Sequence, residues 1–436
     1  MLIKPFKAYR FNPDVVKNNG DCISPPYDVI SEKLQSHLYA KSDYNIVRVI
    51  KGKTNDSDSE SDNQYTRAAE FLNDWIGQNA LKQDDKEMIY SYIQDFQLGN
   101  QNVQRSSFIA TAKLEDLGAG VKPHENTLDG PKADRLKLQL ACQAKFGLIF
   151  MLYKDQQMVA DNINQKKLED NPLVDFIDEQ GVRHRLFGIS DQNDMDAIGE
   201  MMKDKTCIIA DGHHRYETAL NFYKQTKNPA AQFQMMAFAN TCNQGLLVLA
   251  THRLVYGINN FSGEKLLADL SEDFTITDFT FNNDSDKAQA KQKMLSAMKS
   301  DFDNDKNCFG VYCSKGKFST VSLKNKDAME SIAADKTPDW RKLNVAVLHK
   351  LLLEKQLGID DKALAAKTNL EYVKDTPDAI DECIEKVDNG ISQAAFFISP
   401  EKMDQIAAVS ETGEKMPQKS TYFYPKVYTG LTVQKI

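Results

Sequence analysis

Several features that define common protein classes are missing from this chain of 436 residues. Its apolar runs, such as residues 146–153, fall far short of the roughly 20 residues that a membrane-spanning helix needs. The first residues contain no apolar core of signal-peptide length. The seven cysteines include no Cys-x-x-Cys pair, which favours reduced thiols over a disulfide framework. These absences predict a cytoplasmic protein without a membrane partner.

The best-known nucleotide and hydrolase motifs are also missing. The sequence contains no Walker A pattern, no Gly-x-Gly-x-x-Gly after a strand, no Gly-x-Ser-x-Gly elbow and no kinase-type His-Arg-Asp loop. This excludes the folds that carry those motifs, but it does not exclude nucleotide binding as such.

A surplus of positive charge is missing as well, since the formal net charge is -8. An acidic balance argues against nucleic acid as the main partner. The apolar fraction of 41% and the charged fraction of 27% are typical of a globular protein. The length is sufficient for two or three domains.

Short strands alternate with amphipathic helices along the chain, which predicts a mixed α/β (α+β) fold. We expect a catalytic domain over residues 1–258 and a second α/β domain over 259–436. The C-terminal loop, residues 415–426, is expected to return to the site. The predicted elements include strands 46–50, 87–96 and 106–114, a hairpin of strands 309–312 and 318–321, and a long helix over 342–356.

The densest polar cluster follows a short apolar strand. It consists of Asp211, Gly212, His213, His214 and Arg215. Helical spacing of the apolar residues that follow predicts a helix that begins near His213 or His214, with Asp211 as its N-cap. Gly212 allows a ligand to approach the backbone, and Arg215 adds a fixed cation. A helix start with such a cation suits an anion, most often phosphate.

Two roles are open for the acidic residue of this cluster: Asp211 is a ligand for Mg²⁺ or a general base. Neighbouring side chains on a helix point about 100° apart, so we expect one of His213 and His214 to face the ligand and the other to pack inward. Glu217 is placed to orient His213. The alternative is that Asp211 only caps the helix and the histidines lie on a hydrated surface.

A second polar cluster follows a proline and leads into the next predicted helix. We predict His124 and Glu125 as acid or base and Thr127, Lys132 and Arg135 as phosphate ligands. An exposed turn with mixed charges is the alternative.

Two smaller groups complete the predicted site. Tyr27 and Asp28 follow a rigid Pro-Pro turn, and Arg253 follows a strand predicted over residues 245–250. These three are predicted to bind substrate. Asp28 could instead cap the next helix.

The C-terminal loop carries Lys419, Ser420 and Thr421 beside an aromatic strand. Their ammonium and hydroxyl groups are predicted to contact phosphate, although a basic loop is often only solvated.

These segments together identify the chain as a member of a prokaryotic family that is catalogued as domain of unknown function 1015. The resemblance rests on six segments: Pro25-Pro26-Tyr27-Asp28-Val29-Ile30, Lys122-Pro123-His124-Glu125-Asn126-Thr127, Gly130-Pro131-Lys132-Ala133-Asp134-Arg135, Ala210-Asp211-Gly212-His213-His214-Arg215-Tyr216-Glu217, Thr251-His252-Arg253 and the run from Met416 to Lys426.

The Asp-Gly-His-His-Arg segment alone also resembles the phosphate-binding segment of free serine kinases in the ParB/sulfiredoxin-like superfamily. This resemblance implies a ParB/sulfiredoxin-like catalytic part, Mg²⁺, and ATP or ADP as phosphoryl donor. It places Asp211, His213, His214 and Arg215 around the transferred phosphoryl group. Glu125, or alternatively Asp28, would then activate the acceptor hydroxyl.

The leading hypothesis is a nucleotide-dependent phosphotransferase that acts on a small hydroxylated metabolite, with free L-serine as the specific choice. One alternative is a phosphatase or nucleotide hydrolase that uses the same site. Another is a non-catalytic, nucleotide-gated binding protein. The sequence sets neither the oligomeric state nor the identity of the nucleotide.

Overall fold

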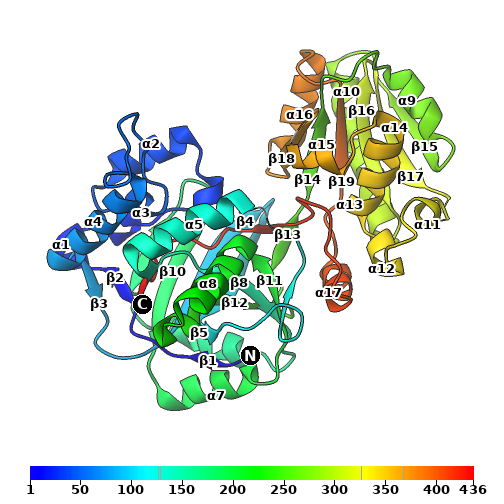
Figure 1. Ribbon diagram of the computed structural model, residues 1–436. Helices are drawn as coiled ribbons and strands as arrows, with labels where there is room; N and C mark the ends of the chain where they lie inside the picture. Colours follow the sequence, from blue (N-terminus) through cyan, green and yellow to red (C-terminus); the bar gives the residue numbers. More distant parts are fainter. Residues whose placement is uncertain (126, 128, 326, 367) are drawn as a thin grey trace. The chain divides into compact units, whose positions relative to one another are not determined.

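The computed structural model describes residues 1–125, 127, 129–325, 327–366 and 368–436, and these form two compact units (Figure 1). Asn126 of the second polar cluster lies outside the described residues. Unit 1 consists of Met1–Pro123, Thr127–Leu247 and Pro425–Ile436, and unit 2 of His124–Asn126 and Val248–Tyr424. Both units combine helices with a sheet, so the predicted mixed α/β class is confirmed.

Unit 1 is built on a nine-stranded mixed sheet with the order β6-β11-β8-β12-β5-β4-β10-β9, with β1 paired to β5. The pairs β6–β11 and β8–β12 are parallel and the others antiparallel. The predicted pairing of two strands around residues 87–114 is confirmed by the hairpin β4–β5. The strands are β1 (Ile3–Lys4), β4 (Ile89–Leu98), β5 (Gln101–Lys113), β6 (Val121–Pro123), β8 (Ile149–Tyr153), β9 (Val174–Ile177), β10 (Arg183–Ile189), β11 (Cys207–Asp211) and β12 (Phe233–Asn240).

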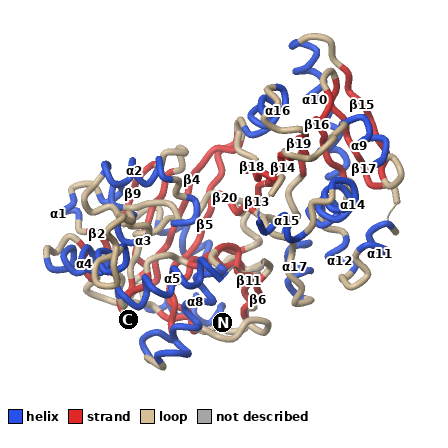
Figure 2. The backbone as a smooth tube through the Cα atoms, turned by 45° about the horizontal axis from the view of Figure 1, so that its top comes forward, coloured by secondary structure: helices blue, strands red, loops and turns tan. Residues whose placement is uncertain are grey.

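Three helices of unit 1 pack in series, α4 (Gln64–Gly77) against α5 (Asp129–Cys142) and α5 against α8 (His213–Thr226). Both views show α5 and α8 side by side (Figures 1 and 2). The space between α5 and α8 is where the candidate site lies. The other helices are α1 (Pro13–Val16), α2 (Glu32–Lys41), α3 (Val47–Ile50), α6 (Val159–Lys167) and α7 (Gln192–Met202).

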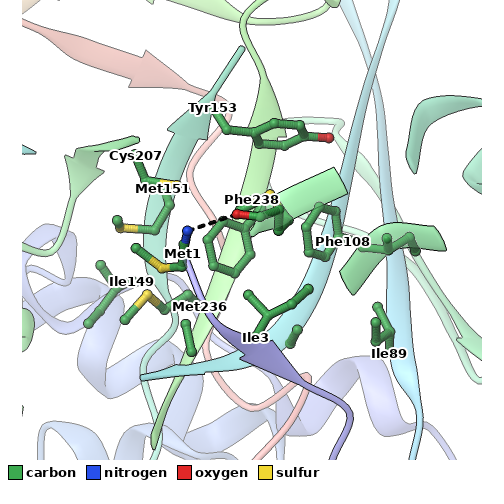
Figure 3. Close-up of a cluster of buried hydrophobic side chains, with 14 of the residues drawn as sticks. Met1, Ile3, Ile89, Phe108, Ile149, Met151, Tyr153, Cys207, Met236 and Phe238 are labelled. Carbon is green, nitrogen blue, oxygen red and sulfur yellow. Dashed lines mark hydrogen bonds between the residues drawn. The ribbon is translucent and has the colours of Figure 1, made fainter. Parts of the chain in front are cut away.

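The main core of unit 1 joins the sheet to helices from distant parts of the chain. Side chains from β8, β11 and β12 meet Met1 and Ile3 at the N-terminus (Figure 3). The amino group of Met1 donates to the Met202 carbonyl oxygen over 2.8 Å. This packing fixes the end of β11, from which the densest polar cluster extends.

The predicted strand over residues 46–50 is wrong, because these residues form the short helix α3. The side chain of Asn45 is buried, and it accepts the backbone N–H of Val47 over 2.9 Å. Such a local hydrogen bond starts a helical turn. Here it outweighs the β preference of the branched residues that follow.

Unit 2 contains a six-stranded sheet with the order β15-β17-β16-β19-β14-β18, all of whose pairs are antiparallel. Helices α10 and α16 contribute to its core. The predicted hairpin is confirmed by β16 and β17. The sheet includes the strand that contains Arg253, which the sequence assigned to the first domain. The strands of this sheet are β14 (Thr251–Val255), β15 (Phe274–Thr280), β16 (Cys308–Ser314), β17 (Lys317–Leu323), β18 (Leu370–Lys374) and β19 (Ala394–Ile398). The helices of unit 2 include α9 (Gly263–Leu270), α10 (Asp284–Asp303), α11 (Ala328–Ile332), α12 (Pro338–Arg341), α15 (Asp361–Ala366), α16 (Ala379–Asp388) and α17 (Met403–Glu411).

The long helix predicted over residues 342–356 is divided into shorter parts. Helix α13 (Asn344–Val347) leads into a π-helical segment, η4 (Leu348–Glu354), and then into α14 (Lys355–Leu357). Hydrophobic periodicity does not distinguish a π-helical turn from an α-helical one. Among the described residues, no helix has the length and apolar character that a membrane crossing requires.

Candidate functional site

The densest polar cluster lies where strand β11 ends and helix α8 begins. Asp211 is the last residue of β11, and α8 begins at His213, as predicted. The predicted N-cap is wrong: Gly212 holds that position with a φ of 94°, and no side chain caps the first turn. A left-handed φ favours glycine, which explains the residue at this position.

Arg215 folds back over this turn instead of extending into solvent. Its Nη1 donates to the carbonyl oxygen of Leu148. A Cβ atom on Gly147 would lie 3.1 Å from the Arg215 Cδ, and one on Gly212 would lie 2.9 Å from its Nε. The guanidinium of Arg215 thus occupies space that side chains at Gly147 and Gly212 would fill, although these two glycines are far apart in sequence.

The carboxylate of Asp211 is flanked by two cations. Its Oδ2 accepts the Lys426 ammonium over 3.1 Å, and its Oδ1 lies 3.7 Å from Nη2 of Arg215. Burial alone would raise the pKa of this carboxyl, but the positive charges of Lys426 and Arg215 reverse the effect and hold the pKa well below its usual range. Asp211 is therefore ionised at neutral pH.

A buried polar network lies behind this carboxylate. The amide of Gln94 donates to the Lys426 carbonyl oxygen over 2.9 Å, and its Oε1 accepts from Arg105. Arg105 is fully buried, stacks over the Phe150 ring at 4.6 Å, and has an Nη1 without a hydrogen-bond partner among the described residues. Burial lowers its pKa to about 10, while the charge of Asp211 acts in the opposite direction.

Sequence reasoning missed Arg105 and Gln94 and gave Lys426 no role. Arg105 follows the polar residues Gln101, Asn102 and Gln104 in β5, so the local pattern does not mark it as buried. Buried charges of this kind are rare unless they are paired.

A cavity of about 60 Å³ lies beside the cluster, and we call it the α5–α8 cavity. Three cationic residues, Arg135, Lys145 and Arg215, line it, and no Asp or Glu is among its described lining residues. Its other lining residues are Tyr27, Ile50, Leu138, Gln139, Ala144, Phe146, Gly147, Thr218, Gln234 and Thr429. Arg135 and Arg215 also face the carboxylates of Asp134 and Asp211, neither of which lines the cavity. A cavity lined by cations is suited to an anionic ligand.

Lys145 is the most deeply buried cation of this cavity, with 4% of its surface exposed. Its ammonium donates to the carbonyl oxygens of Ala231 and Phe233. Burial lowers its pKa to about 7. Sequence reasoning missed this residue, because nothing in a Lys followed by an apolar strand marks it as buried.

The predicted substrate residues of the Pro-Pro turn have different surroundings. Tyr27 lines the α5–α8 cavity, and the Arg135 guanidinium stacks 4.0 Å from its ring centre. Arg135 also donates from Nη1 to the Ile50 carbonyl oxygen over 2.7 Å. Asp28 is exposed, and it does not cap helix α2, whose N-cap is Ser31.

Two predicted phosphate ligands meet at one carboxylate. Oε2 of Glu217 accepts the Thr127 hydroxyl over 2.8 Å and the Lys132 ammonium over 3.3 Å. Lys132 also pairs with Asp129 over 3.0 Å. Glu217 thus connects α8 to the segment around α5, a different role from the predicted orientation of His213.

The two histidines differ in burial, as expected for neighbours on a helix. His213 is 7% exposed, and His214 is half-buried. The positive form of His213 contributes to the low pKa of Asp211. The inward-facing histidine is therefore His213.

The remaining predicted residues belong to unit 2. Nε2 of the buried His124 lies 2.9 Å from the Thr421 hydroxyl and 4.0 Å from a carboxylate oxygen of Glu125. Ser420 is buried and donates to the Pro417 carbonyl oxygen, and Lys419 is exposed with a φ of 58°. Within unit 2, the second polar cluster and the C-terminal loop therefore meet at His124 and Thr421.

Arg253 lies in strand β14 of unit 2 and is 1% exposed. Its guanidinium donates to the Lys419 carbonyl oxygen over 3.2 Å and stacks over the Tyr372 ring at 4.6 Å. Nη2 also lies 3.2 Å from Nε2 of His349. Burial lowers the Arg253 pKa to about 10.

A metal site formed by protein side chains alone is not found. Among the described residues, no three His, Cys, Asp or Glu side chains are grouped so that they could hold an ion. Asp211, the predicted Mg²⁺ ligand, already faces two cations. Its surroundings do not fit a metal ion bound directly to this carboxylate.

The family comparison agrees with the motifs. The model of the family described as "Protein of unknown function (DUF1015)" matches residues 3–346. The chain belongs to the DUF1015 family. The matched part contains the clusters around Asp28, His124, Lys132, Asp211 and Arg253, whereas the C-terminal segment 416–426 lies beyond it. No curated protein is significantly similar to this DUF1015 chain.

Several solved structures are distantly similar. A free serine kinase in complex with AMP has 10% identity and a TM-score of 0.33, with 71% of this chain and 92% of that chain covered. A C-terminally truncated SbnI from Staphylococcus aureus has 10% identity and a TM-score of 0.35, with coverages of 75% and 87%. A conserved hypothetical protein from Pyrococcus furiosus has 12% identity and a TM-score of 0.32, with coverages of 71% and 89%. We base the function on this chain's own residues.

Proposed function

We propose that this protein is a nucleotide-dependent phosphotransferase whose unit 1 binds a phosphoryl group between helices α5 and α8. The observation that carries the proposal is the α5–α8 cavity with its three cationic residues and no lining carboxylate among the described residues. The acceptor is a small hydroxylated metabolite, for which free L-serine is the first choice.

The size and charge of the cavity support a compact anion. A volume of about 60 Å³ accommodates about four or five water molecules, which is similar to the space that a phosphoryl group needs. Arg215 provides a guanidinium, the group that binds phosphate oxygens in pairs. Arg135 adds positive charge, while its N–H groups donate to Asp134 and to the Ile50 carbonyl oxygen. The positive end of the α8 dipole lies at the same turn.

Phosphoryl transfer depends mainly on position and charge, because the transition state spreads negative charge over the oxygens of the transferred group. Side chains held rigidly before the ligand arrives stabilise that charge most effectively. Arg215 meets this requirement, since the Leu148 carbonyl and two glycines fix its guanidinium.

We assign Asp211 a positioning role in place of direct metal binding. Its carboxylate holds Lys426 and Arg215 on either side, and the network through Gln94 and Arg105 holds the backbone at Lys426. Mg²⁺ would then be carried by the phosphates of the nucleotide, as is usual for this ion. When bound there, it neutralises charge on the transferred group.

The acid or base that acts on the acceptor hydroxyl is proposed from the predicted residues. Glu125 remains the first choice and Asp28 the second, and His214 is the less buried of the two histidines at α8. We propose His124 as a residue that positions the Glu125 segment, since its ring contacts Thr421. A Glu125→Gln substitution should reduce turnover and leave nucleotide affinity unchanged.

Phosphorus NMR of the full chain with Mg²⁺ and ATP, ADP or CTP, each with and without L-serine, tests the proposal. A new phosphomonoester signal that requires serine would support the kinase function and identify the donor. Phosphate release in both samples would favour the hydrolase. Nucleotide binding without turnover of serine or of other hydroxylated acceptors would contradict the transferase and favour the nucleotide-gated binding protein.

A further inference from the structure

Unit 2 contains a second cavity that the proposed function does not use. It has a volume of about 340 Å³ and lies beside the π-helical segment η4; we call it the η4 cavity. Its lining includes Trp340, Leu364, His349, Lys336, Lys415 and Gln418. π-Helical segments are rare and occur frequently at functional sites.

His349, in η4, is 2% exposed, and its hydrogen bonds determine which ring nitrogen carries the proton. The Nη2 of Arg253 lies 3.2 Å from Nε2 of His349. A guanidinium can only donate, so Nε2 must be the acceptor. Burial and the nearby charges of Arg253 and Lys350 lower the pKa of His349 well below its usual value, so the ring is neutral. Its single proton therefore resides on Nδ1.

This Nδ1–H is a buried donor that lacks a hydrogen-bond partner among the described residues. Buried donors in native proteins are almost always paired, so an unpaired one requires an explanation. The neighbouring Arg253 also has an unpaired Nε, and no ion pair is found for it among the described residues. Two buried donors thus lack acceptors here: the Nδ1–H of His349, which lines the cavity, and the Nε–H of Arg253, which lies behind it.

The charges on the cavity wall are mainly positive, since Lys336, Lys350 and Lys415 line it together with one carboxylate, that of Asp335. Lys336 pairs with Asp335 over 3.2 Å, and Lys350 pairs with Glu354 over 2.6 Å. Lys415, in contrast, makes no ion pair with any described residue, and its backbone oxygen accepts the Trp340 indole N–H over 3.0 Å. The wall therefore offers one uncompensated ammonium next to an aromatic ring.

We propose that the η4 cavity binds a small organic anion with an apolar body. Its carboxylate or phosphate oxygen accepts the Nδ1–H of His349 and pairs with Lys415, and its body packs against Trp340 and Leu364. The volume lies within the range of small-molecule sites, which combine apolar walls with a few fixed polar groups. The site does not depend on the phosphotransferase activity of unit 1.

Fluorescence of Trp340 tests this proposal, since the chain has only one other tryptophan, Trp75. In a full-length Trp75→Phe variant, benzoate and phenyl phosphate should change the emission in a saturable way. Benzylammonium, which has a similar body and the opposite charge, should not. No saturable change up to about 10 mM of either anion, or an equal response to benzylammonium, would overturn the proposal.

A matched pair of charge reversals locates the site. Lys415→Glu should weaken benzoate binding about tenfold or more. Lys265→Glu, at an exposed position of α9 in the same unit, should leave it unchanged. Equal affinities in both variants would contradict the assigned anion site.

Nitrogen NMR of the wild-type chain labelled at histidine provides a test that needs no substitution at tryptophan. The chain has seven histidines. The signal that disappears in His349→Gln should show the Nδ1–H tautomer, and that proton should shift when benzoate is added. The Nε2–H tautomer, or a proton that benzoate does not move, would contradict the proposal.

Discussion

The two cavities differ in size and in the kind of cation that lines them. In unit 1, the α5–α8 cavity is small and lined by Arg135, Lys145 and Arg215. In unit 2, the η4 cavity is several times larger, and it is lined by lysines together with apolar side chains such as Trp340 and Leu364. In each cavity, two of the three cations pair with a carboxylate. The first arrangement suits a compact anion with high charge density, and the second suits an organic body with a single anionic group.

Each unit also buries one arginine in a similar environment. Arg105 and Arg253 both stack over an aromatic ring at 4.6 Å, both have a pKa lowered to about 10, and both have one unpaired nitrogen among the described contacts. Their partners differ, since Arg105 donates to the Gln94 amide and Arg253 to a histidine and two backbone oxygens. A buried guanidinium can therefore support an adjacent site without a direct carboxylate partner.

The largest expected effect comes from Arg215→Ala. Removing this fixed guanidinium should lower kcat of the phosphotransferase reaction about 100-fold to 1,000-fold, because the charge of the transition state loses a donor. The response of Trp340 to benzoate should not change. Steady-state kinetics and fluorescence of the same preparation measure both, and full activity of the variant would contradict the site assignment.

Gly212→Ala should reduce sulfate affinity about tenfold, since a Cβ displaces Arg215 and the φ of 94° is strained for alanine. Calorimetric titration with sulfate measures this. Gly199→Ala is the matched control, because this helical glycine has open space around its Cβ position. It should stabilise the protein by about 0.5–1 kcal/mol and leave sulfate binding unchanged.

Asp211→Asn separates a positioning role from a metal-binding role. The substitution removes a negative charge between Lys426 and Arg215, so sulfate affinity should rise about threefold while turnover falls. If Asp211 binds Mg²⁺ directly, the variant should instead need a much higher Mg²⁺ concentration, with unchanged sulfate affinity.

The smallest expected effect is the pH dependence of sulfate binding. Lys145 has a pKa of about 7 because burial disfavours its charged form. It is protonated below that pH, so sulfate affinity should be a few-fold higher at about pH 6 than at about pH 8.5. Sulfate stays dianionic over this range. Lys145→Gln should remove the part of the dependence that Lys145 contributes, and an unchanged pH profile would exclude a role for it.

The sequence alone determined the family, the mixed α/β class, the start of helix α8 and most of the polar residues around it. These features depend on local patterns, such as a glycine between an apolar strand and an amphipathic helix. The paired strands β4 and β5 were also predictable, because a short turn joins them in the chain.

Only the tertiary structure decided which polar residues work together. Lys426 pairs with Asp211 across more than 200 residues, and Arg105, Lys145 and His349 acquire their properties from burial. The short helix α3 was not predictable either, because the burial of Asn45, whose side chain bonds to its first turn, is recognisable only in the folded chain. Sequence patterns report propensity and spacing along the chain, whereas pKa values, unpaired donors and cavities depend on what the fold brings into contact.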